Sequence, residues 1–141
     1  IAEWLKASKY QEELKDIEFD SAGFFNVYKE AQPETVAFLK EKGIDYSNFR
    51  GKKVDTELLE KQDLILVMQE RHLKRLKRRF KEVKDIGEKS YIIKEFAGEK
   101  EKLDIPDPVK KNAEEYRKII EEVEDAVVKS IKKIIQINQE G

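Results

Sequence analysis

A run of five apolar residues, "LILVM" at Leu64–Met68, narrows the choice of fold more than any other segment of this sequence. It is too short for an amphipathic helix, and such a run is typical of a strand buried on both faces of a parallel sheet. The segment "SYII" at Ser90–Ile93 predicts another strand. A further strand is predicted where Ile17, Phe19 and Ser21 alternate with acidic residues.

Helical patterns lie between these strands. Pro33 suits the first turn of a helix and Gly43 suits its end, and Thr56 can cap a short helix. The predicted helices are Ile1–Lys15, Pro33–Gly43, Glu57–Lys61, Gln69–Phe80 and a long amphipathic helix from Tyr116 to Ile135. Alternating strands and helices indicate an α/β fold with a mostly parallel sheet, and the length fits one domain, residues 1–141.

The charge balance and the absence of cysteine restrict the possible functions. There are 29 Lys and Arg against 30 Asp and Glu, so the net charge of −1 gives no general reason to expect nucleic acid or an anionic membrane as a partner. The 42% charged content is typical of ion-pair networks in heat-adapted proteins, and we expect a thermostable, cytoplasmic protein. With no cysteine, these residues supply no disulfide, thiolate metal site or cysteine nucleophile.

The beginning of the chain is unusual. Ile1 lies directly inside a helical pattern with no initiator methionine, and the first helix lacks a strand to feed it. We therefore expect further residues ahead of Ile1.

One carboxylate, Asp107 in "DIPDP", lies between Pro106 and Pro108. Proline fixes its own backbone and restricts the residue before it, so Asp107 has few backbone states available. It could cap the following helix, because Asp is a good N-cap and proline suits the first helical position. It could also be held as an acid for chemistry, with Asp104 as a weaker competitor.

Five segments, in this order, resemble the low-molecular-weight protein tyrosine phosphatase family. "IAEWL" resembles the helix that follows the family's phosphate loop, and "DSAGFF" its Ser-Ala-Gly turn. "TVAFLKEKGID" and "DLILVMQERHLKRL" match further elements, and "DIPDP" resembles the loop that carries the catalytic acid. The resemblance implies a three-layer α/β/α fold with a small parallel sheet in the strand order 2-1-3-4. It also implies that the first strand and the phosphate loop are missing before Ile1.

The resemblance also implies a mechanism and assigns roles. Phosphomonoester hydrolysis would proceed through a phosphocysteine, with the cysteine upstream of Ile1 and Asp107 as general acid. Phosphate or another oxyanion would bind at the N-terminus of the first helix. Ser21 would support the phosphate loop, although a serine that ends a strand in a turn needs no such role. No metal or organic cofactor is expected.

The expected substrate pocket involves Phe25, Tyr28 and Val109. Phe25 or Tyr28 would wall the cleft, or both could be ordinary loop anchors. Val109 stands where the family usually has Tyr or Phe, which weakens an aromatic clamp on phosphotyrosine. Asn48 and Phe49 stand near the position of a common family histidine.

Phosphotyrosine in proteins is the first choice of substrate. A phosphoarginine phosphatase of the same family and an inactive module that recognises phosphorylated partners are the alternatives. Arsenate reductases share the fold but need further cysteines downstream, and this sequence has none, so that activity is disfavoured. The two predicted strands Leu64–Met68 and Ser90–Ile93 argue against a purely helical interaction protein. We interpret His72, the only histidine, as a polar residue on a helix. We interpret the basic run Arg71–Lys81 as a solvated helix face, although it could contact RNA phosphates.

Overall fold

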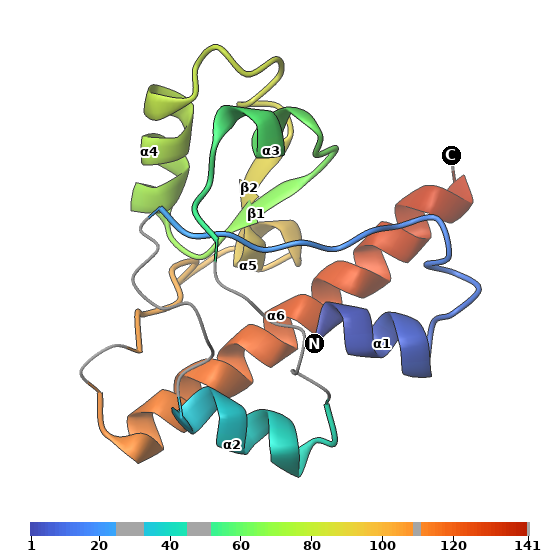
Figure 1. Cartoon of the computed structure of the whole chain (residues 1–141), viewed down its shortest axis with the longest axis vertical. Coiled ribbons are helices and arrows are strands. Elements are labelled where there is room, and N and C mark those ends of the chain that lie inside the picture. Colours follow the sequence, from blue (N-terminus) through green and yellow to red (C-terminus); the bar gives the residue numbers. More distant parts are fainter. Residues whose placement is uncertain (25–32, 45–51, 109–110, 141) are drawn as a thin grey trace.

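The computed structural model of the chain describes residues 1–24, 33–44, 52–108 and 111–140. In chain order its elements are α1 (Ala2–Ser8), α2 (Pro33–Glu41), α3 (Thr56–Glu60), β1 (Ile65–Val67), α4 (Glu70–Arg79), β2 (Ser90–Ile92), α5 (Ile93–Phe96) and α6 (Ala113–Glu140). β1 and β2 pair in parallel, with Ile65 opposite Ser90 and Val67 opposite Ile92 (Figure 1). The parallel sheet predicted from the apolar run is confirmed.

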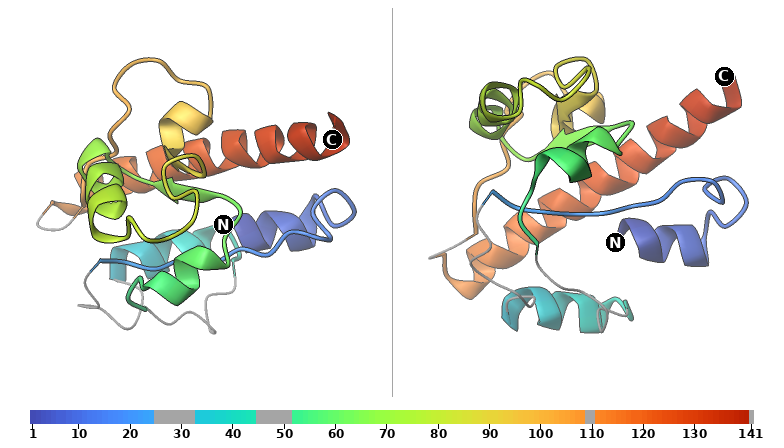
Figure 2. Two further views of the ribbon diagram at one scale, coloured as in Figure 1. Left: turned by 90° about the horizontal axis from the view of Figure 1, so that it is seen from above. Right: turned by 45° about the horizontal axis from the view of Figure 1, so that its top comes forward.

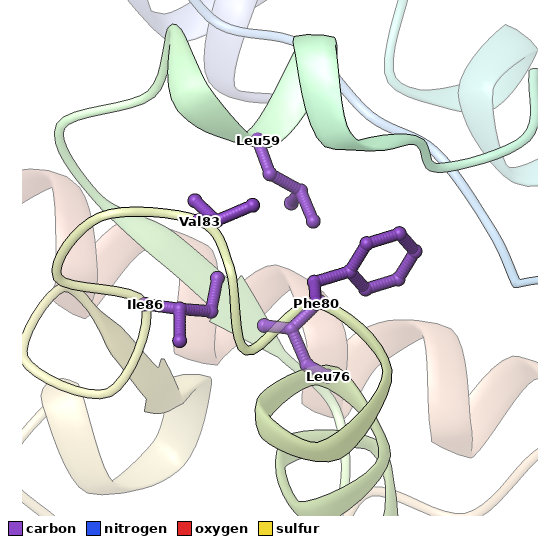
Figure 3. Close-up of a cluster of buried hydrophobic side chains, with 5 residues drawn as sticks. All are labelled: Leu59, Leu76, Phe80, Val83 and Ile86. Carbon is purple, nitrogen blue, oxygen red and sulfur yellow. The ribbon is translucent and has the colours of Figure 1, made fainter.

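Helices cover both faces of this small sheet. On one face, Ile65 and Val67 pack against a buried cluster from α3, α4 and the loop after α4. Figure 3 shows the members of this cluster: Leu59, Leu76, Phe80, Val83 and Ile86. On the other face, Leu66 packs against buried residues of α5, α6 and the loop between them: Ile93, Ile105, Ile119 and Ala126. Alternate side chains of β1 enter two separate cores, which is the three-layer α/β/α arrangement.

α6 is the longest helix, and α1 and α2 lie along it (Figures 1 and 2). Leu5 and Leu14 pack with Ile131 in one cluster, and Phe38 packs with Tyr116 in another. The amphipathic stripe predicted for this helix is therefore confirmed. Neither α6 nor any other helix in the described ranges has the length and apolar character needed to cross a bilayer.

The first helix is shorter than predicted, because the sequence indicates Ile1–Lys15 and α1 ends at Ser8. The Ser8 hydroxyl donates to the Trp4 carbonyl at 2.6 Å, and the Tyr10 N–H closes the helix on the Leu5 carbonyl at 2.9 Å. Such local hydrogen bonds compete with continuation of a helix. Leu14 still reaches the core from the turns that follow, and its side chain is fully buried.

The strand predicted at Ile17, Phe19 and Ser21 is not formed within the described residues. The first regular pairing after α1 is a single parallel bridge between Gly23 and Lys53. A strand requires a neighbouring backbone about 4.8 Å away, and no described segment pairs with residues 17–22.

One predicted helix cap is wrong and one helix end is confirmed. Asp55, not Thr56, caps α3, because its carboxylate accepts the Leu58 N–H at 2.8 Å. The Thr56 hydroxyl instead donates to Glu82 at 3.2 Å. Gly43 follows α2 with a φ of +70°, a left-handed conformation that favours glycine at a helix end.

Candidate active site

A cavity of about 350 Å³ opens where the C-terminal end of β1 meets the loop that leads into α6. Ligands of open parallel α/β sheets bind beyond the carboxyl ends of the strands, so the position indicates a functional site. The cavity is lined by Ile1, Thr35, Phe38, Leu39, Met68, Gln69, His72, Ile105, Pro106, Asp107, Pro108, Tyr116, Ile119, Ile120 and Val123. Most of the lining residues are apolar, and Gln69 and His72 at the start of α4 add polar groups near the Asp-Pro loop.

Two hydrogen bonds fasten the Asp-Pro loop to the end of β1. The Ile105 N–H donates to the Met68 carbonyl at 2.9 Å. The Gln69 side-chain amide donates from Nε2 to the Ile105 carbonyl at 2.8 Å. Ile105 is itself only 1% exposed, so both of its backbone groups are satisfied inside the protein. The loop is thereby held at a fixed distance from the sheet.

A third hydrogen bond joins the same loop to α4. The Asp104 carboxylate accepts the Glu70 N–H at 2.8 Å, in the first turn of the helix. A carboxylate at this position satisfies an unpaired helix amide and interacts favourably with the helix dipole. Asp104, which the sequence left as a weaker competitor for the acid role, therefore has a structural task.

The N-terminus of α6 tests the interpretation of Asp107 as a helix cap. The Asn112 side chain accepts the Glu115 N–H at 2.8 Å, so Asn112 caps this helix. The interpretation of Asp107 as the helix cap is wrong, because α6 begins at Ala113, five residues beyond Pro108. Asp107 instead lies exposed on the wall of the cavity. Ile1, from which α1 starts, lines the same cavity.

His72 also lines the cavity and is electrostatically coupled to the loop. Partial burial lowers the pKa of His72 below its usual value, and the charges of Arg71 and Arg75 lower it further. Asp107 and Asp104 act in the opposite direction and raise this pKa. The interpretation of His72 as a polar helix residue omitted its place beside the candidate acid.

Phe24 extends the site on the side of α4. Its ring centroid lies 5.9 Å from that of His72, and the guanidinium of Arg75 lies 5.2 Å from the Phe24 centroid. Ser21, three residues earlier, is exposed and does not line the cavity, so its support of a phosphate loop stays a prediction.

The three predicted pocket residues, Phe25, Tyr28 and Val109, lie outside the described residues.

The sequence interpretation missed Gln69, whose amide holds the Asp-Pro loop. A signal was available, because Gln69 is the first polar residue after the buried strand, and that end of a parallel strand is where functional groups gather. Its partner at Ile105 had no local signature, since the two residues are far apart in the chain. Within the described ranges, no three His, Asp or Glu side chains come together as a metal site requires.

Comparison with known protein families gives a match that spans almost the entire sequence. The family model described as low molecular weight phosphotyrosine protein phosphatase matches residues 1–140. The chain belongs to this family. Its members are phosphatases, and the resemblance inferred from the five sequence segments is confirmed.

Solved structures of this phosphatase family match closely. The chain is 35% identical to the low molecular weight protein tyrosine phosphatase from T. tengcongensis, covering 94% of this chain and 88% of that one with a TM-score of 0.77. It is 27% identical to the YwlE arginine phosphatase from Geobacillus stearothermophilus, covering 93% and 82% with a TM-score of 0.80. Wzb from Vibrio vulnificus, in complex with benzylphosphonate, is 26% identical, with 87% and 84% covered and a TM-score of 0.72. A comparison with curated protein sequences gives no match.

Proposed function

We propose that this protein hydrolyses phosphomonoesters on phosphorylated proteins, with phosphotyrosine as the first choice of substrate and Asp107 as general acid. The observation that carries the proposal is that Asp107 and Ile1, where α1 begins, line one cavity. A proton donor and a helix start that could receive a phosphate thus face the same space. Asn112, not Asp107, caps α6, and Asp104 accepts the Glu70 N–H at the start of α4.

The proposed reaction has two steps. A cysteine thiolate attacks phosphorus and forms a phosphocysteine, while Asp107 gives its proton to the departing phenolic oxygen. Asp107, now ionised, then takes a proton from the water that releases phosphate. None of the 141 residues is cysteine, so the nucleophile would come from residues ahead of Ile1.

Two considerations favour phosphotyrosine over phosphoarginine. The tyrosine phosphatase from T. tengcongensis is 35% identical to this chain, whereas the YwlE arginine phosphatase is 27% identical. The ring of Phe24 lies 5.9 Å from that of the cavity residue His72 in a tilted arrangement, and aromatic side chains near the site favour a phosphotyrosine ring. Peptides that carry each phosphorylated side chain, assayed side by side, test this choice.

Substitution of Asp107 by Asn tests the acid. The variant, expressed with whatever residues its own gene encodes before Ile1, should lose roughly 10²–10³-fold in kcat on a phosphotyrosine peptide. The loss should be much smaller on p-nitrophenyl phosphate, whose leaving group needs little protonation. Equal kcat for variant and parent on the peptide would remove Asp107 from the mechanism.

Asp104→Asn is the matched control. It makes the same chemical change three residues away and keeps a carbonyl oxygen that can still accept the Glu70 N–H. We expect its kcat to depend on the leaving group as in the parent protein. A protein that binds phosphotyrosine peptides and hydrolyses none would instead support the inactive binding module.

A further inference from the structure

α4 carries an excess of positive charge that the rest of the fold does not explain. Between Glu70 and Arg79 the helix has six Lys or Arg residues and one acidic residue, in a chain whose net charge is −1. Its inward side is apolar, with Leu76 buried in the cluster against β1. We name the exposed side formed by Arg71, Lys74, Lys77 and Arg78 the α4 cationic face.

These four side chains lie on one side of the helix, because Lys74 follows Arg71 by three residues, and Lys77 and Arg78 follow Lys74 by three and four. Figures 1 and 2 show α4 at the edge of the molecule. From Arg71 to Arg78 the face extends about 10 Å along the helix axis, which is the length of about three residues of extended peptide.

Few acidic groups neutralise this face. Lys74 pairs with Glu70 at 3.5 Å, while Lys77 and Arg78 have no acidic partner within 4.0 Å among the described residues. On α6, by comparison, three of the five cations form ion pairs among the described residues, and Lys132 and Lys133 form none. Arg117, Lys118 and Lys129 each pair with at least one carboxylate.

The helix dipole explains part of this arrangement. Cations near a helix C-terminus are favourable, which accounts for Lys77 and Arg78. Arg71 lies in the first turn, where a positive charge is unfavourable, and like charges three or four residues apart cost roughly 0.2–0.5 kcal/mol per pair in isolated helices. The cations at this end therefore need another reason.

The face begins at the cavity. Gln69 and His72, on either side of Arg71 in the sequence, both line the cavity, and Arg71 donates a hydrogen bond from Nε to Gln69 Oε1. A peptide whose phosphorylated side chain enters the cavity would pass Arg71 and continue along the helix.

We propose that the α4 cationic face binds acidic residues that flank the phosphorylated side chain of a substrate protein. The proposal rests on the proposed phosphatase function and names the chemistry of its substrate. The face would speed encounter and tighten binding of acidic segments, and its contribution would weaken with salt.

Four synthetic peptides separate this proposal from the function on which it rests. Each has three Glu or three Gln residues on both sides of either phosphonomethylphenylalanine, a stable phosphotyrosine mimic, or phenylalanine. Fluorescence anisotropy gives their Kd values without turnover. The ratio of phenylalanine to phosphonate Kd tests the phosphate site, and the ratio of Gln to Glu Kd tests the cationic face.

At low salt we expect the Glu phosphonate peptide to bind about three- to tenfold more tightly than its Gln counterpart. Lys74→Gln with Arg78→Gln should bring this ratio close to one. Lys100→Gln with Lys132→Gln, which removes two exposed cations elsewhere, should leave the ratio unchanged.

The results that would refute the phosphate site differ from those that would refute the α4 cationic face. Equal Kd values for phosphonate and phenylalanine peptides would refute the phosphate site. A Gln to Glu ratio near one in the parent protein, or the same ratio in both double variants, would overturn the docking face. A short RNA that binds more tightly than the Glu peptide and loses affinity in the α4 variant would also overturn it, in favour of nucleic acid.

Discussion

Substitution of Gln69 by Met should weaken the anchor of the Asp-Pro loop while keeping a side chain of similar length. The Gln69 amide donates to the Ile105 carbonyl at 2.8 Å, and the variant leaves that carbonyl without its donor. Ile105 is buried, so water cannot readily replace the lost partner. An unsatisfied buried acceptor costs about 1–3 kcal/mol, and we expect the free energy of unfolding to fall by this amount.

Urea unfolding followed by circular dichroism measures the effect. With an m-value of roughly 1–2 kcal/mol/M, the midpoint should fall by about 1 M without a change in m. Gln62→Met is the matched control, because Gln62 also donates from Nε2 to a backbone carbonyl, that of Leu58, at 3.1 Å. That bond lies at the end of a short helix and is less buried, so its loss should cost about 0.5 kcal/mol or less.

A double-mutant cycle that combines Gln69→Met with Asp104→Ala tests whether Gln69 and Asp104 stabilise the Asp-Pro loop together. Both contact the Asp-Pro loop and α4, so their effects should couple by roughly 0.5 kcal/mol or more. A Gln69→Met variant within about 0.5 kcal/mol of the parent would refute the argument that this hydrogen bond anchors the loop.

Two further predictions concern a titrating group and the core. Burial lowers the pKa of His72, so around and below pH 6.5 the folded chain binds fewer protons than the unfolded chain. The contribution of neutral His72 to the free energy of unfolding is therefore complete above about pH 6.5. It is lost as the pH falls through the lowered pKa of the folded state. His72→Gln should therefore flatten the fall of the urea midpoint on acidification, and an unchanged slope would contradict this. Leu14→Ala, at a side chain that is 0% exposed, should cost about 2–5 kcal/mol in urea unfolding. Ile137→Ala, at a side chain that is 49% exposed, is its control, and equal losses would contradict the core assignment.

The elements that the sequence predicts well carry their reason in adjacent residues. Leu64–Met68 predicts a strand buried on two faces, and β1 sends Ile65 and Val67 to one core and Leu66 to another. The end of α2 follows from Gly43, whose φ of +70° favours glycine. In both cases a short local pattern contains the physical cause.

The elements that the sequence predicts poorly depend on distant or competing partners. Alternation at Ile17, Phe19 and Ser21 indicates side chains on two faces, but a strand also needs a paired neighbour, and no described segment pairs with residues 17–22. Thr56 and Asp55 are both good cap residues, and Glu82 draws the Thr56 hydroxyl away. Neither outcome could be read from local sequence.

The candidate acid shows how the sequence and the structure contribute different parts of one inference. Two prolines single out Asp107, yet they fit a helix cap as well as an acid. In the structure Asn112 caps α6, and Asp104, not Asp107, accepts the Glu70 N–H in the first turn of α4. Asp107 therefore lies on the cavity wall without serving as the cap of α6, and the capping interpretation no longer competes with the acid role. The same three anchoring bonds would keep its carboxyl group at a constant position while substrate binds, as proton transfer requires.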